Sequence, residues 1–110
     1  MIKDDAVYLG HIQDAVVRIQ EYIAATDEDG FKGDSMRQDA VIRQLEIIGE
    51  AAKRVGDKTR AQAPHIPWRK LAGMRDKLIH EYFGIDLDAV WMTVTLDLPV
   101  LEKEIAPLLD

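Results

Sequence analysis

The stretch 73–84 brings together Arg75, His80 and Tyr82, and the chemistry of the arginine and the histidine suits a phosphodiester substrate. Histidine has an ordinary pKa near neutral pH, so His80 could take a proton from a ribose 2′-hydroxyl or, when charged, protonate a leaving oxygen. The guanidinium of Arg75 could hold the phosphate and stabilise the negative charge of the transition state. Asp76 could orient either group. Because the ribose supplies the nucleophile, RNA cleavage by these residues demands neither a metal nor a cofactor.

The spacing of these residues leaves their meeting point open. On an ideal helix Arg75 and Tyr82 fall on nearly one line, whereas Arg75 and His80 differ by about 140°. His80 could reach Arg75 through the length of the arginine, through a helix that loosens before Gly84, or across a dimer interface. One Arg/His pair does not supply both an acid and a base, and a two-fold dimer would bring two pairs together. The mechanism therefore predicts a homodimer. The same pattern also fits a solvated arginine, a helix-end histidine and a core tyrosine.

Other candidate sites are weaker. His11 and His65 lie far from His80 in the sequence, and no histidine, aspartate or glutamate has a recognisable ligand spacing, so we predict no metal site. Glu46 and Glu50 are one helical turn apart and could form a paired-carboxylate site. Since the same helix also carries lysine and arginine, a salt-bridged polar face is the favoured interpretation of these two carboxylates.

The elements that must position these residues are helices. Apolar residues at spacings of three and four predict helices over 4–25, 35–55 and 67–82, and a last one from residue 87 onward. Asp34 or Ser35 and Asp86 are predicted caps, and 26–33 is a predicted loop. Residues 57–63 could form one more short helical turn before the prolines at 64 and 67. Pro99 predicts a kink or a division of the last helix near 97–99. No strand is predicted, so we expect an all-α bundle of four main helices in one domain over 1–110.

Composition narrows the possible environments and partners. The 110 residues are 47% hydrophobic and include no cysteine, which excludes disulfides and thiolate metal sites. No run of about 20 apolar residues and no signal peptide is found, so we expect a cytoplasmic protein without a membrane partner. The net charge of −6 works against long-range attraction to nucleic acid, although it leaves room for a local basic pocket inside an acidic protein.

Beyond this chemistry, the order of residues resembles a known family. Arg75, His80 and Tyr82 stand as in the Arg-x4-His-x-Tyr motif of the HepT-like branch of the HEPN superfamily. Asp76 stands where close relatives often carry asparagine. The similarity extends over nearly the whole chain, in the blocks 43–52 (RQLEIIGEAA), 66–68 (IPW), 73–75 (GMR), 80–86 (HEYFGID) and 90–91 (VW).

The resemblance implies a HEPN-type antiparallel bundle that dimerises and acts as a metal-independent endoribonuclease toxin of a toxin–antitoxin system. Arg75 and His80 would be catalytic and Asp76 supporting. Tyr82 would accept AMP from a cognate minimal nucleotidyltransferase antitoxin, and this AMPylation would silence the cleft. The expected partners are RNA, the antitoxin and a second copy of the chain, but not DNA. The alternative is a catalytically inactive HEPN dimer that binds a nucleotidyltransferase. The acidic net charge and the aspartate at position 76 favour this alternative.

Overall fold

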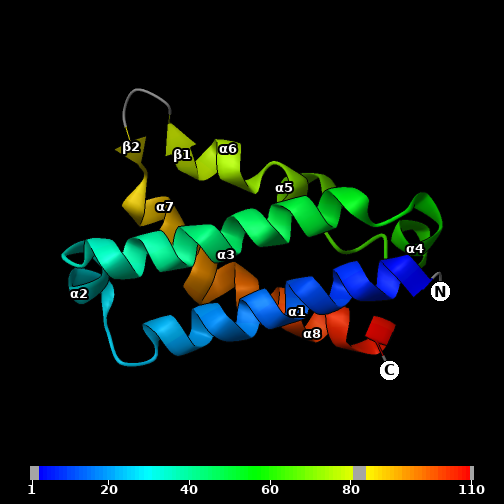
Figure 1. The fold of residues 1–110 in the computed structure, drawn as a ribbon, viewed down its shortest axis with the longest axis horizontal. Coiled ribbons are helices and arrows are strands. Elements are labelled where there is room, and N and C mark those ends of the chain that lie inside the picture. The colour runs from blue at the N-terminus through cyan, green and yellow to red at the C-terminus, as the bar shows by residue number, and fades with distance from the viewer. Residues whose placement is uncertain (1–2, 81–83, 110) are drawn as a thin grey trace.

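The computed structural model describes residues 3–80 and 84–109, and its longest elements are two antiparallel helices, α1 (Lys3–Ile23) and α3 (Ser35–Arg54) (Figure 1). Each helix turns a stripe of apolar side chains toward the other, which confirms both predicted helices. The buried residues of the two stripes include Leu9, Ile12, Val16 and Ile19 in α1 and Val41, Leu45, Ile48 and Ala52 in α3. The side chain of Asp34 accepts a hydrogen bond from the Arg37 amide at 3.1 Å, so Asp34 caps α3 as predicted.

The connection between α1 and α3 is more ordered than its composition predicts. Residues 26–33 are polar and contain two glycines, yet they include a short helix, α2 (Glu28–Lys32), capped by Asp27. The prediction of a plain loop was therefore wrong. Phe31 explains the helix, because its fully buried ring packs 5.5 Å from the Trp91 ring and fixes the segment on the core.

The last helix runs without a break from Leu87 to Leu109, and a wider turn interrupts its α-helical pattern next to Pro99. Its three parts are α7 (Leu87–Met92), the π-helical turn η1 (Thr93–Asp97) and α8 (Leu98–Leu109). Proline lacks an amide hydrogen, so Pro99 cannot donate to a carbonyl in the preceding turn. The backbone responds with a wider turn, in which the Leu98 amide donates to the carbonyl of Thr93, five residues earlier. Asp86 caps α7 through the Ala89 amide at 3.1 Å.

The region between α3 and α7 differs most from the prediction. It contains α4 (Asp57–Gln62), α5 (Trp68–Ala72), α6 (Met74–Leu78) and two short strands, β1 (Ile79–His80) and β2 (Gly84–Ile85). The single helix predicted over 67–82 is wrong, because α5 ends at Ala72 and α6 ends at Leu78. The prediction of no strand is also wrong, since β1 and β2 pair antiparallel.

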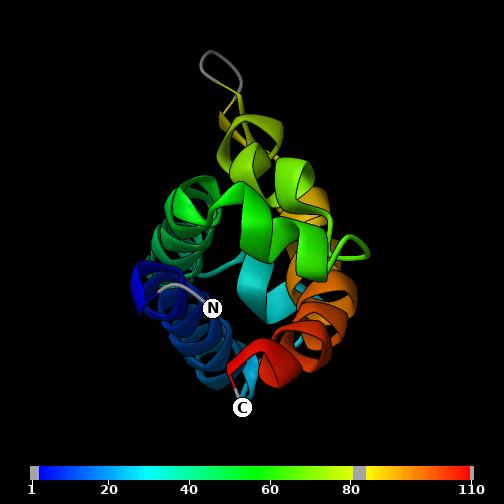
Figure 2. The ribbon, with the colours of Figure 1, turned by 90° about the vertical axis from the view of Figure 1, so that its right-hand side faces the viewer.

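Four main helical segments nevertheless enclose one core, so the predicted all-α antiparallel bundle is confirmed. Its main members are α1, α3, the α5–α6 segment and the last helix. Figure 2 looks along the bundle and shows α5 and α6 lying against α3, with the two strands pointing away from the core. None of the helices in the described ranges combines the length and the apolar character that a membrane crossing needs.

Candidate active site

The segment that leads to the site starts at a well-anchored tryptophan. Trp68 begins α5 and is 7% exposed, and its indole nitrogen donates to the carbonyl of Ala63 at 3.0 Å. Pro67 stands directly before it, where a missing amide hydrogen leaves no helical bond unmade. The Pro67 carbonyl accepts from the Leu71 amide at 2.9 Å. The start of α5 is thus held by backbone and side chain together.

α5 lies directly on α3 at a glycine. A Cβ atom placed on Gly49 would come within 3.2 Å of the Leu71 carbonyl and 3.6 Å of the Ala72 carbonyl. The backbones of the two helices can approach this closely because residue 49 has no side chain. Gly10, the glycine inside α1, has nothing within 4 Å of such a Cβ, so no backbone approach explains it.

α6 and the paired strands position the predicted catalytic residues. Arg75 lies in α6, and the first and last residues of this helix, Met74 and Leu78, are buried with 7% and 1% exposure. His80 is the second residue of β1 and pairs with Gly84, which has a positive φ of 77° that suits glycine. The helix therefore ends before His80, so the 140° separation of an ideal helix does not apply. A helix that loosens before Gly84 was one of the three predicted routes by which His80 could reach Arg75, and α6 does end before His80. The meeting of the two side chains stays a prediction.

The predicted site residues all belong to one short segment, and the structure describes some of them more fully than others. For Arg75 and His80 the structure describes the backbone, five residues apart across the end of α6. Asp76 is exposed in the first turn of α6. Tyr82 lies outside the described residues, so its predicted role as the modification site stays a prediction.

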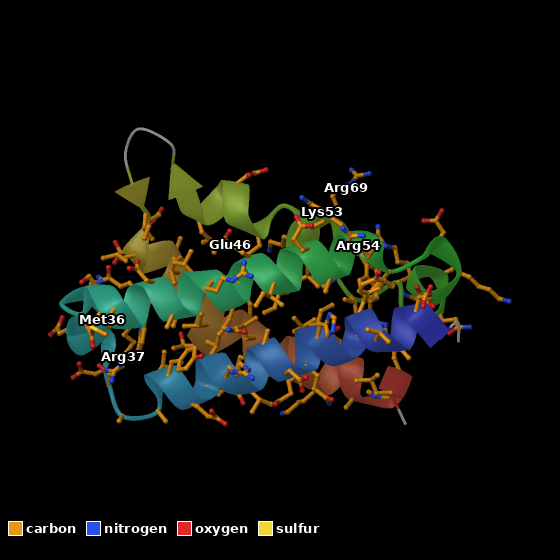
Figure 3. The ribbon with its side chains drawn as sticks, viewed as in Figure 1. Met36, Arg37, Glu46, Lys53, Arg54 and Arg69 are labelled. Carbon is orange, nitrogen blue, oxygen red and sulfur yellow. The ribbon has the colours of Figure 1, made fainter. Side chains whose placement is uncertain are left out.

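The two carboxylates of α3 are not a matched pair. Glu50 is exposed and lies 3.5 Å from the Lys53 ammonium, as expected for a salt-bridged surface. Glu46 is half-buried and is not a free carboxylate. Figure 3 places Glu46 in the middle of α3, below α6. The two glutamates therefore have different surroundings, which argues against a shared acid–base role.

A small apolar groove lies behind α6, on the side of the last helix. Its volume is about 180 Å³, and its lining includes Met74 and Leu78 of α6 and Leu101 of α8. Small-molecule sites usually measure about 300–1,000 Å³. The groove is therefore smaller than a usual small-molecule site, and it is not a candidate nucleotide pocket.

A perturbed pKa is found far along the chain from this segment, at Lys32. A hydrogen bond with Asp88 raises the pKa of Lys32, and a second one with Glu28 at 3.4 Å adds to this effect. Lys32 belongs to α2 and Asp88 to α7, so the pair links two elements of the scaffold. Lys32 is therefore a structural cation and not a candidate catalytic base.

The sequence around the candidate site is basic, although the chain as a whole is acidic. Residues 53–77 contain eight lysines or arginines and two aspartates, which is a net charge of +6 in a chain of net charge −6. The basic members are Lys53, Arg54, Lys58, Arg60, Arg69, Lys70, Arg75 and Lys77. A charge count in short windows would have found this segment, whereas the total charge pointed away from nucleic acid.

Comparison with known proteins finds one matching family model and several relatives. The family model described as Ribonuclease HepT-like matches residues 12–108. "Probable ribonuclease HepT" of Thermococcus cleftensis is 46% identical over 95 residues, which are 86% of each chain. A "Putative RNase" of Caldanaerobacter subterraneus subsp. tengcongensis is 38% identical over 109 residues, 99% of this chain and 97% of the relative.

One relative is a longer protein. The "Gamma-glutamylcyclotransferase and putative RNase" of Methanocaldococcus jannaschii is 44% identical over 110 residues, and this chain spans 50% of its length. No solved structure matches the chain at a significant level. The family match over most of the residues, with the all-α HEPN-type fold, shows that this chain belongs to the ribonuclease HepT-like family.

Proposed function

We propose that this chain is a metal-independent endoribonuclease and the toxin of a toxin–antitoxin system. The observation that carries the proposal is the placement of Arg75 and His80 across the end of α6 in a member of the ribonuclease HepT-like family. Relatives that are named as ribonucleases support the same reaction class.

The proposed reaction is a transesterification within the RNA. A neutral His80 takes the proton of the 2′-hydroxyl, and the 2′-oxygen forms a bond to the adjacent phosphorus. The bond from phosphorus to the 5′-oxygen breaks, and a charged histidine protonates that oxygen. Arg75 binds the phosphate and stabilises the negative charge that grows on its oxygens. The products are a 2′,3′-cyclic phosphate and a 5′-hydroxyl.

A homodimer meets the need for two proton-transfer groups. One histidine cannot be neutral and charged in the same step, so the second copy of His80 would act as the acid while the first acts as the base. A two-fold axis near α6 would place both copies in a shared cleft. Asp76, exposed beside Arg75 in the sequence, would support the orientation of the arginine or of the histidine.

Modification of Tyr82 is the proposed off-switch. A nucleotidyltransferase antitoxin would form a bond from the Tyr82 oxygen to the α-phosphorus of ATP and release pyrophosphate. The added AMP brings bulk and negative charge within seven positions of Arg75 in the sequence. A phosphate held close to the arginine would compete with the RNA phosphate for the same cation.

The cleavage proposal is tested with purified protein, RNA and a metal chelator. We expect cyclic-phosphate ends from the unaltered chain and a loss of roughly 100-fold or more in rate for His80→Ala, since general acid–base groups contribute about 10² to 10⁴. An unchanged rate in His80→Ala would contradict the mechanism. Absence of cleavage by the unaltered chain, together with tight binding to the nucleotidyltransferase, would favour the inactive binding dimer instead.

The modification is tested separately by intact mass after incubation with the cognate nucleotidyltransferase and ATP. We expect the mass of the chain to rise by whole AMP units and the mass of Tyr82→Phe to stay unchanged. The matched control is Tyr22→Phe, because Tyr22 is a half-buried tyrosine of α1. A persistent mass increase in Tyr82→Phe would refute the assignment of this residue.

A further inference from the structure

Three cations of the basic segment lie at the same end of the α3–α5 pair. Lys53 and Arg54 lie in the last turn of α3, and Arg69 lies in the first turn of α5. The two helices run antiparallel. The end of α5 lies on Gly49 of α3. The first residue of α5, Trp68, lies next to Arg60, whose guanidinium donates to carbonyls at the end of α3. Figure 3 shows all three cations there, with Arg37 at the opposite end of α3.

These cations are available to a ligand. Lys53 is 56% exposed, and its carboxylate neighbour Glu50 is 64% exposed, so water weakens that ion pair. Arg54 and Arg69 are exposed, and among the described residues neither lies within ion-pair distance of a carboxylate. Exposed cations without acidic neighbours attract phosphate groups, whatever the sign of the remaining surface.

The path of the chain connects this surface to the candidate active site. Arg69 of α5 precedes Arg75 of α6 by six residues, and only Gly73 separates the two helices. A nucleic-acid strand lying along α5 would therefore present a neighbouring phosphate to α6. Trp68, the aromatic residue of α5, is buried, so it offers no face for a base to stack on.

We propose that Lys53, Arg54 and Arg69 form a phosphate-binding surface, the basic surface, which holds the backbone of single-stranded RNA next to α6. This inference rests on the proposed ribonuclease function and names how its substrate is held. Because the surface offers charge without base stacking, binding should depend strongly on salt and little on nucleotide sequence. An acidic region of a partner protein is the competing occupant, and the experiment below separates the two.

The test measures the affinity of the full-length His80→Ala protein for fluorescent single-stranded RNAs by anisotropy, at several salt concentrations. The triple variant Lys53→Gln, Arg54→Gln, Arg69→Gln should bind roughly 10- to 100-fold more weakly. Its slope of log affinity against log salt should be smaller by about 2, since each phosphate contact in a single strand contributes about 0.7. The loss should be similar for RNAs of different sequence.

A matched control removes the same charge elsewhere. The triple variant Arg18→Gln, Arg37→Gln, Lys103→Gln alters α1, the start of α3 and α8, and should change the affinity less than about threefold. A second control keeps the positive charge: the double variant Arg54→Lys, Arg69→Lys leaves Lys53 unaltered. This variant should keep most of the affinity, which shows that the Gln triple variant loses affinity through its charge. In the protein with His80 intact, the Gln triple variant should lose cleavage through a higher KM.

The outcomes separate this inference from the proposed function. If the Gln triple variant weakens RNA binding while the protein with His80 intact does not cleave RNA, the basic surface is supported and the ribonuclease proposal fails. RNA binding with the same affinity and salt slope in the Gln triple variant would overturn the basic surface. The same result with lost nucleotidyltransferase binding would assign these cations to the protein partner and overturn it equally.

Discussion

Asp5 and Asp76 both stand in the first turn of a helix, but their surroundings are opposite. Asp5 is 4% exposed at the start of α1, and it accepts hydrogen bonds from the Gly56 amide at 3.1 Å and the Thr59 hydroxyl at 2.5 Å. Asp76 is exposed in α6, beside the candidate catalytic arginine. The first carboxylate joins α1 to the α3–α4 junction, whereas the second is open to solvent.

Arg60 and Arg69 repeat this contrast with the opposite charge. Arg60 donates to the carbonyls of Val55 at 3.0 Å and Ala52 at 2.7 Å, and its guanidinium lies 6.0 Å from the centre of the Trp68 ring. Arg69, on α5, is exposed. The residue type is the same in each pair, so burial and partners separate the residues that hold the fold from those that can bind a ligand.

The largest effect on stability is expected from Asp5→Ala. The substitution removes a buried acceptor and leaves the Thr59 hydroxyl and the Gly56 amide without their partner. Hydrogen bonds to a charged group contribute about 1.5–3 kcal/mol each, and we expect a loss of about 2–3 kcal/mol in the free energy of unfolding. Denaturant unfolding measures this as a lower midpoint with an unchanged slope.

Asp76→Ala is the control for the other side of the comparison. Because Asp76 is exposed, its removal should change the free energy of unfolding by less than about 0.5 kcal/mol. It should instead slow RNA cleavage if the proposed supporting role holds. Equal stability of Asp5→Ala and Asp76→Ala would contradict the contrast drawn between the two carboxylates.

Periodicity predicted the scaffold because the scaffold is periodic. Leu9, Ile12 and Val16 are fully buried where their spacing placed them, and Asp34 and Asp86 cap the helices they precede. A hydrophobic stripe and a short capping side chain act within a few residues of their own position, so the sequence shows them directly.

The boundary at the candidate site could not be predicted in this way. The spacing of Leu71, Met74 and Leu78 continues a helical stripe, and nothing local marks the change to an extended backbone at Ile79. That change depends on pairing with β2, and a two-residue strand is too short to show alternation. The catalytic residues were predicted from side-chain chemistry and family resemblance. The basic surface was not predicted, because the total charge of −6 sums acidic and basic segments of the chain.

Arg60→Ala is expected to have the smaller effect on stability and tests the second pair. The guanidinium binds the last turn of α3, where carbonyls lack amide partners of their own. Since Arg60 is only half-buried, water can replace part of these bonds, and we expect a loss of about 1 kcal/mol. Arg69→Ala should leave the unfolding midpoint nearly unchanged and weaken RNA binding instead. If both arginine variants lowered stability equally, Arg69 would belong to the scaffold, and the basic surface would lose the residue that connects it to α6.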